Sequence, residues 1–66
     1  MNILSIGKNL ANLRGNKTQD EVSKALGISK SALSMYETGQ RIPRDAIKIK
    51  LAKYYEGSIQ DIFFKE

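Results

Sequence analysis

The stretch that decides the fold is TQDEVSKALGISKSALSMYETGQR, which runs from Thr18 to Arg41. It predicts two short helices joined by a tight turn at Gly27, because glycine readily adopts the positive φ that such a turn needs. The second helix, over about residues 29–36, has polar side chains on one side and apolar side chains on the other. This division predicts that one side packs on a core and that the other faces a partner.

Local signals support these two helices. Thr18 is followed three residues later by Glu21, which is the spacing of a capping box at a helix N-terminus. Ser29 is expected to cap the second helix. Asp20 and Glu21 both lie at the positive end of the first helix dipole, so we interpret them as helix-start residues and not as a catalytic pair.

The spacing within the stretch is more specific than its composition. Counting from Gln19, the fifth residue is small (Ser23) and the ninth is Gly27. Apolar side chains occupy the fourth, eighth, tenth, fifteenth and eighteenth positions: Val22, Leu26, Ile28, Leu33 and Tyr36. Two helices that cross steeply through a tight turn need this arrangement. Such a pair presents its second helix N-terminus first, as entry into the major groove of DNA requires.

A further helix is predicted before this stretch. Its apolar residues recur at spacings of three and four, which places them on one helical face: Ile3, Ile6, Leu10 and Leu13. Gly7 destabilises a helix interior, which favours a start at Ser5 over a start capped by Asn2. Gly15 and Asn16 are expected to end this helix.

Two helices are predicted after the stretch. Pro43 marks the start of the first, which has an inward stripe and ends at Gly57; the stripe is Ile47, Leu51, Ala52 and Tyr55. Its lysines are expected to form a solvated face: Lys48, Lys50 and Lys53. Ser58 is expected to cap a short last helix whose apolar residues close the core: Ile59, Ile62 and Phe63.

Composition limits the classes of function. The 66 residues predict one domain, residues 1–66, without cysteine or histidine, which excludes disulfides and the common zinc sites. With no glycine-rich phosphate loop either, we predict no catalytic site, no metal site and no cofactor. The net charge of +4 is compatible with a polyanionic partner. Neither a membrane span nor a signal peptide is predicted, so the cytoplasm is the expected location.

The motif TQDEVSKALGISKSALSMYETGQRIP resembles the Cro/cI-type helix-turn-helix family, the xenobiotic-response-element-like group of phage and bacterial repressors. The resemblance extends over essentially the whole chain, and these residues match the family pattern: Gln19, Gly27, Ser29, Ser34, Glu37, Gly39, Arg41 and Pro43. It implies an all-α, compact five-helix, lambda-repressor-like domain with the helix-turn-helix in its second and third helices. It also implies binding to double-stranded operator DNA as a homodimer on a two-fold symmetric site.

The resemblance assigns roles position by position. Base edges are expected to be read by Lys30, Ser31, Ser34 and Met35. The DNA backbone is expected to be contacted by Lys17, Gln19, Ser29, Gln40, Arg41 and Arg44. Gln19 matches a glutamine that clamps a phosphate and braces the recognition helix. Lys30 has the chemistry to donate to guanine O6 or N7, and Met35 to touch a thymine methyl.

The chain also departs from the family pattern. Serine stands at position 23, where relatives often have alanine, and the link from Leu13 to Thr18 is shorter than the commoner pattern. The family often pairs an arginine late in the first helix with the glutamate that Glu37 matches, and Arg14 is the candidate here. The recognition positions are not glutamine-rich, so the resemblance implies a binding mode but no operator sequence.

Three apolar residues remain after the core is assigned, and they suggest a dimer contact, with core sealing as the alternative: Ile49, Tyr54 and Phe64. The leading hypothesis is therefore a repressor that excludes polymerase from a promoter and has no small-molecule effector domain. The second hypothesis is an antitoxin-like or regulatory protein–protein interaction module with secondary DNA binding. An enzyme is not expected.

Overall fold

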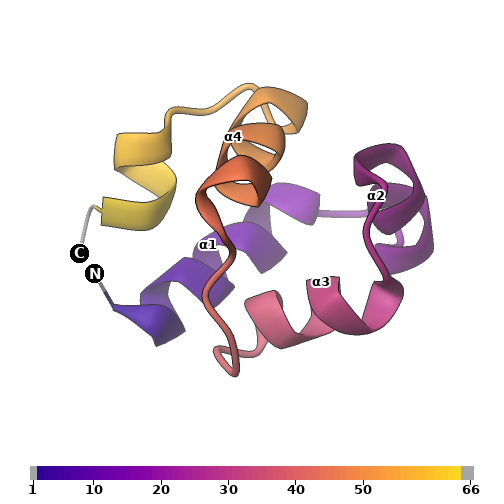
Figure 1. Cartoon of the computed structure of the whole chain (residues 1–66), viewed down its shortest axis with the longest axis horizontal. Helices are drawn as coiled ribbons and strands as arrows, with labels where there is room; N and C mark the ends of the chain where they lie inside the picture. Colours follow the sequence, from indigo (N-terminus) through magenta and orange to yellow (C-terminus); the bar gives the residue numbers. More distant parts are fainter. Residues whose placement is uncertain (1, 65–66) are drawn as a thin grey trace.

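The chain folds into five consecutive helical segments, and the computed structural model describes residues 2–64 of it (Figure 1). They are α1 (Ile3–Arg14), α2 (Gln19–Leu26), α3 (Lys30–Glu37), α4 (Asp45–Tyr54) and a π-helical turn, η1 (Gln60–Phe64). Figure 1 shows α1 running through the middle of the molecule, and α1 packs against both α3 and η1. The predicted all-α, five-helix fold with the helix-turn-helix in α2 and α3 is confirmed.

The start of α1 differs from the prediction. The Asn2 side chain caps the helix, because its Oδ1 accepts hydrogen bonds from the N–H groups of Leu4 (3.0 Å) and Ser5 (3.1 Å). A start at Ser5 was therefore wrong, and Gly7 lies inside the helix. Its role is a close approach: a Cβ at Gly7 would lie 2.5 Å from the carbonyl oxygen of Glu37. Tertiary packing of α1 on α3 therefore outweighs the poor helix propensity of glycine.

The other predicted helix ends of the helix-turn-helix are confirmed. Gly15 ends α1 with φ 56°, and Gly27 adopts the left-handed conformation with φ 70°. The Thr18 Oγ1 accepts from the N–H of Glu21 (3.1 Å), and the Ser29 Oγ accepts from the N–H of Ala32 (3.0 Å). These side chains satisfy donors that a helix N-terminus leaves without a backbone partner.

The core lies between α1 and the other four segments. Its buried apolar residues are Ile6, Leu10, Val22, Leu26, Leu33, Tyr36, Leu51, Ala52, Ile62 and Phe63. Ser23 is buried as well, with its hydroxyl donating to the carbonyl oxygen of Asp20 (3.1 Å), so the expectation of a small residue here is confirmed. Leu13 is 41% exposed, contrary to its expected place on the inward face of α1.

Two expectations about α4 were wrong. The helix ends at Tyr54, and the left-handed conformation after it is taken by Glu56 (φ 55°) and not by Gly57. Lys48 is buried, not solvated: its ammonium lies 3.7 Å from Asp45 Oδ1 and 5.3 Å from the ring centroid of Phe64. A lysine can bury its long aliphatic stem against apolar surface while its charge reaches a partner.

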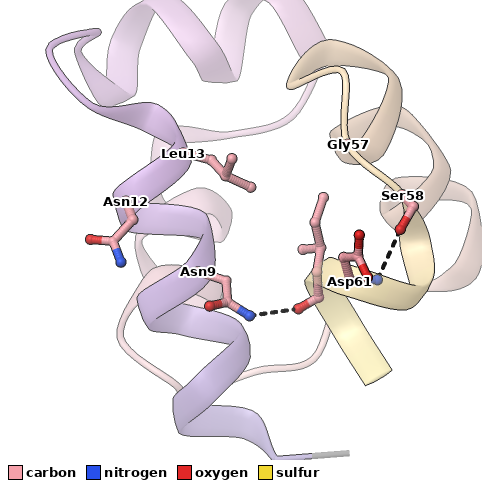
Figure 2. Close-up of a pocket in the computed structure, with 7 residues that line it drawn as sticks. Asn9, Asn12, Leu13, Gly57, Ser58 and Asp61 are labelled. Atoms are coloured by element: carbon pink, nitrogen blue, oxygen red, sulfur yellow. Dashed lines mark hydrogen bonds between the residues drawn. The ribbon is translucent and has the colours of Figure 1, made fainter. Parts of the chain in front are cut away.

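Side-chain hydrogen bonds shape and attach η1. As Figure 2 shows, the Asn9 side chain of α1 donates to the backbone oxygen of Ile62 over 3.0 Å. The predicted cap is also present, because Ser58 Oγ accepts from the N–H of Asp61 (3.0 Å). Together these bonds hold Ile62 and Phe63 in the core, as predicted.

Candidate nucleic-acid interface

The N-terminal end of α3 is presented to solvent. Lys30 and Ser31 are exposed, whereas Leu33 and Tyr36 on the opposite side of the helix are buried in the core. Within residues 2–64, neither the Lys30 ammonium nor the Ser31 hydroxyl has a hydrogen-bond or ion-pair partner. The helix dipole adds partial positive charge at the same end, so this surface attracts anions and keeps donors available.

The other two predicted base-reading residues are less accessible. Ser34 and Met35 lie one turn further along α3 and are half-buried, although the sequence had placed them facing out. Thr38 Oγ1 donates to the carbonyl oxygen of Ser34 over 2.8 Å, which closes the C-terminal turn of α3 next to them. Direct access to α3 is therefore greatest at its first turn.

A buried carboxylate fixes the orientation of α3. The Glu37 side chain at the end of α3 is 4% exposed, and its Oε2 lies 2.8 Å from Arg14 Nε of α1. Its Oε1 accepts a hydrogen bond from Gln19 Nε2 of α2 over 3.0 Å. Because both oxygens are paired, this one side chain joins three helices, which makes the direction of α3 dependent on α1 and α2.

Arg14 also fixes the short link before α2. Its Nη1 donates a hydrogen bond to the backbone oxygen of Lys17 at a distance of 2.7 Å. The hydrogen bond to Glu37 raises the pKa of the Arg14 guanidinium, so the group stays charged. The pairing that the resemblance implied is thus present despite the short link, and Gln19 occupies the bracing position expected of it.

A tyrosine lies near this ion pair without joining it. The Tyr55 hydroxyl is buried and has no hydrogen-bond partner among the described residues. Burial, and after it the negative charge of Glu37, raise the pKa of Tyr55 to about 12. Its hydroxyl therefore remains neutral at physiological pH.

The loop between α3 and α4 exposes three residues that are predicted to contact the DNA backbone: Gln40, Arg41 and Arg44. Its bend uses Gly39 (φ 75°), and the carbonyl oxygen of Met35 accepts from the N–H groups of Gln40 (2.9 Å) and Arg41 (3.3 Å). Pro43, which stands in the chain between Arg41 and Arg44, is buried. The loop thus holds positive charge beside α3.

Comparison with known proteins decides the family. The family model described as helix-turn-helix matches residues 10–62, which cover α2, α3 and the residues that brace them. The chain belongs to the Cro/C1-type helix-turn-helix family. As a member of this family, it is a DNA-binding transcriptional regulator. It is also 35% identical over 51 residues, 77% of each chain, to an uncharacterized HTH-type transcriptional regulator of Methanocaldococcus jannaschii. No solved structure matches the chain.

Two other residues of this helix-turn-helix regulator that were predicted to contact the DNA backbone have partners within the protein itself. Lys17 is exposed, but its ammonium donates to the Tyr54 hydroxyl (3.3 Å) and lies 4.7 Å from the centroid of that ring. It is therefore directed at α4 and not grouped with the loop arginines. Ser29 uses its side-chain oxygen as the α3 cap, which leaves its hydroxyl proton available as a donor.

The three residues predicted for the dimer contact fall into two places. Ile49 is 45% exposed and Phe64 is 46% exposed, and they line one hollow of about 260 Å³ with Ile59, Asp45 and Lys48. Tyr54 lies elsewhere, half-buried against Tyr55 at 5.2 Å between ring centroids and contacted by Lys17. The structure therefore brings together only Ile49 and Phe64 of this set.

Sequence reasoning missed the contribution of Gly7, which is placed against the α3 backbone next to Glu37. The signal was present, because a glycine inside a strong helical pattern often marks a close approach between helices.

Across residues 2–64 no helix is long and apolar enough to cross a membrane.

Proposed function

We propose that this regulator is a sequence-specific repressor that binds a two-fold symmetric operator as a homodimer, with α3 in the major groove. The observation that carries the proposal is the first turn of α3, where Lys30 and Ser31 are exposed while the helix behind them is braced by Glu37. A rigid support with unpaired donors at its tip suits the reading of base edges. A dimer on an operator that overlaps a promoter represses by excluding polymerase.

The proposed roles differ between the helix and the loop. Lys30 donates to guanine O6 or N7, and Ser31 contacts a neighbouring base, so both contribute specificity. Arg41 and Arg44, exposed on the loop, contact phosphates and set the register on the duplex. Gln19 clamps a phosphate while its amide stays bonded to Glu37.

A pair of variants separates these roles on a DNA site recovered by selection. Lys30→Ala is expected to weaken specific binding by about 1–3 kcal/mol and to relax the preference at one base pair. Arg44→Ala is expected to weaken binding to all sequences alike and to lower the slope of log K against log salt by about 1. Unchanged operator affinity in Lys30→Ala would refute the base-reading role.

The homodimer is supported by the hollow that Ile49, Ile59 and Phe64 line. Joining two half-sites raises affinity without new contacts to DNA, and in related dimers the half-sites lie about 34 Å apart. Phe64→Ser is expected to shift the protein from dimer to monomer in sedimentation equilibrium. Leu13→Ser, at a similarly exposed leucine of α1, is the matched control and should leave the dimer unchanged.

An antitoxin-like role is the second candidate, because the same exposed apolar surface suits another protein equally well. A monomer in solution that binds selected DNA weakly, together with unchanged sedimentation of Phe64→Ser, would favour this role over the homodimer.

A further inference from the structure

A second hollow lies between the C-terminal half of α2 and the C-terminal half of α4. It has a volume of about 440 Å³ and is lined by Lys24, Ala25, Leu26, Gly27, Lys50, Lys53 and Tyr54. We call it the α2–α4 groove. Its lining contains three lysines and no acidic residue, and it shares no residue with the first turn of α3 or with the α3–α4 loop. Figure 1 shows α2 and α4 in the upper half of the molecule and α3 in the lower half.

The floor of the groove is apolar, and its lysines differ in whether their ammonium groups are hydrogen-bonded within the protein. The exposed Ala25 and the half-buried Tyr54 ring contribute the apolar surface, because Leu26 is only 6% exposed. The Lys50 ammonium is fixed by donating to the backbone oxygen of Leu26 over 3.3 Å, so this lysine has a structural role at the end of α2. Lys53 is exposed, and the Lys17 ammonium adds positive charge above the Tyr54 ring.

Lys24 is paired only weakly. Its ammonium lies 3.2 Å from Asp20 Oδ2, but the two side chains are 78% and 58% exposed. An exposed pair one helical turn apart is screened by water and salt, so a carboxylate from a partner can replace Asp20 at small loss. Lys24 and Lys53 are therefore the two ammonium groups most available to an incoming anion.

The combination of an apolar floor and a basic rim selects among anionic partners. A nucleic-acid backbone offers phosphates on its outside and would leave the Ala25 and Tyr54 surface without an apolar partner. We propose that the α2–α4 groove binds an acidic segment of a partner protein, in which an apolar side chain lies between carboxylates. The apolar side chain packs on Ala25 and Tyr54, and the carboxylates pair with Lys24 and Lys53. Charge complementarity sets the orientation and burial of the apolar side chain supplies most of the affinity.

The position of the groove links such a partner to α3. Gly27 lines the groove and is also the turn that leads into α3 through the Ser29 cap. A segment bound there contacts the support of the proposed recognition helix without covering Lys30. Control by a regulatory protein is then possible while α3 remains accessible. The inference does not depend on base reading by α3, because its test contains no DNA in the first step.

The test uses the full chain and a synthetic peptide with one leucine flanked on both sides by glutamates. Backbone amide shifts in NMR are followed on titration at physiological salt, where the screening length is about 8 Å. The expected result is saturable shifts at Lys24, Ala25, Gly27 and Lys53. The same peptide with glycine in place of leucine should bind at least about fivefold more weakly, since it lacks the buried apolar group.

Protein variants locate the binding. Lys53→Glu is expected to weaken peptide binding at least about fivefold, because it replaces an attraction by a repulsion at the rim. Lys24→Gln should weaken it to a smaller degree. Lys8→Glu, which carries the same change at an exposed position of α1, is the matched control and should bind like the parent chain. Circular dichroism confirms that each variant is folded, which both exposed positions allow.

Several results would overturn the proposal. They are shifts confined to Lys30, Arg41 and Arg44, equal affinity for the leucine and glycine peptides, or equal weakening by Lys53→Glu and Lys8→Glu. In a second step, duplex DNA is titrated in place of the peptide. Saturable shifts of the groove residues with DNA would assign the groove to nucleic acid and would also overturn it. Failure of the first step with specific DNA binding intact would leave the proposed repressor function standing.

Discussion

Replacing Gly7 by alanine tests how the position of α3 is set. Gly7 lies inside α1, and a Cβ there would be 2.5 Å from the carbonyl oxygen of Glu37 and 3.0 Å from that of Tyr36. Both atoms belong to the α3 backbone, so no side-chain rotation can make room. The new methyl group must therefore push α1 and α3 apart at the residue whose carboxylate braces the site.

Two opposing terms set the size of the effect. Alanine is favoured over glycine in a helix interior by about 1 kcal/mol, which by itself would stabilise the protein. Overpacking a close contact costs about 1–3 kcal/mol, and contacts with rigid backbone lie at the upper end of this range. The net expectation is a destabilisation of about 1–2 kcal/mol, which for a domain of this size lowers Tm by roughly 4–16 °C.

Urea unfolding at 25 °C measures the effect, with Gly27→Ala and Gly27→Asn as controls. Nothing lies within 4 Å of a Cβ at Gly27, so the penalty there comes from its φ of 70° alone. Asparagine tolerates that conformation better than alanine, and Gly27→Asn should therefore be more stable than Gly27→Ala. If Gly7→Ala raised the unfolding midpoint at unchanged m, helix propensity would dominate and the close-approach argument would be wrong.

Two further predictions concern the groups around the ion pair. Glu37→Ala should lower the free energy of unfolding by about 2–3 kcal/mol. This is less than the usual cost of breaking a fully buried ion pair because Arg14 stays partly hydrated, and Glu37→Gln should lower the free energy of unfolding by less. Urea unfolding measures both variants, and values within about 0.5 kcal/mol of the parent chain for both would contradict this prediction. The pKa of Tyr55 is raised on folding from 10 to about 12, so its contribution is present below pH 10 and is lost as the pH rises toward 12. Tyr55→Phe should remove this part of the alkaline loss and should not lower stability at pH 7, since the hydroxyl it deletes has no partner; identical pH profiles of the two proteins would refute the assignment.

The helix-turn-helix was predictable because its determinants are local. Thr18, Ser29 and Gly27 act within a few residues of their own positions, through caps and a positive φ that sequence spacing reveals. The inward positions of Leu33 and Tyr36 follow from helical periodicity alone. For the same reason, exposure at Lys30 and Ser31 followed from the pattern.

The features that were mispredicted depend on contacts between distant segments. Gly7 lies where α3 approaches α1, and the ammonium of the buried Lys48 lies 5.8 Å and 5.3 Å from the ring centroids of Phe63 and Phe64 of η1. Tyr54 is half-buried, and the ammonium of Lys17, from the link before α2, lies 4.7 Å from the centroid of its ring. Periodicity within one helix contains no information about which residue of another helix lies opposite.

The end of α4 has a different cause. Glycine is the usual residue after a helix, but the chain turns at Glu56, one residue before Gly57. A Cβ at Gly57 would lie 3.0 Å from Ile62 Cδ1, so this glycine makes room for a core residue of η1. This neighbour of Gly57 is five residues away in the sequence and belongs to another element, so helix-end signals alone do not reveal it.

Selection of bound DNA from a random pool tests the central claim most directly. The protein is incubated with random duplexes, bound molecules are recovered over several rounds, and the enriched sequences are aligned. Base reading by α3 in a two-fold symmetric dimer predicts an inverted repeat with half-site centres about one helical turn apart. The same selection with Lys30→Ala should give a consensus in which one base pair of each half-site is no longer conserved. Enrichment of no common sequence, or the same consensus for the parent chain and for Lys30→Ala, would contradict the account.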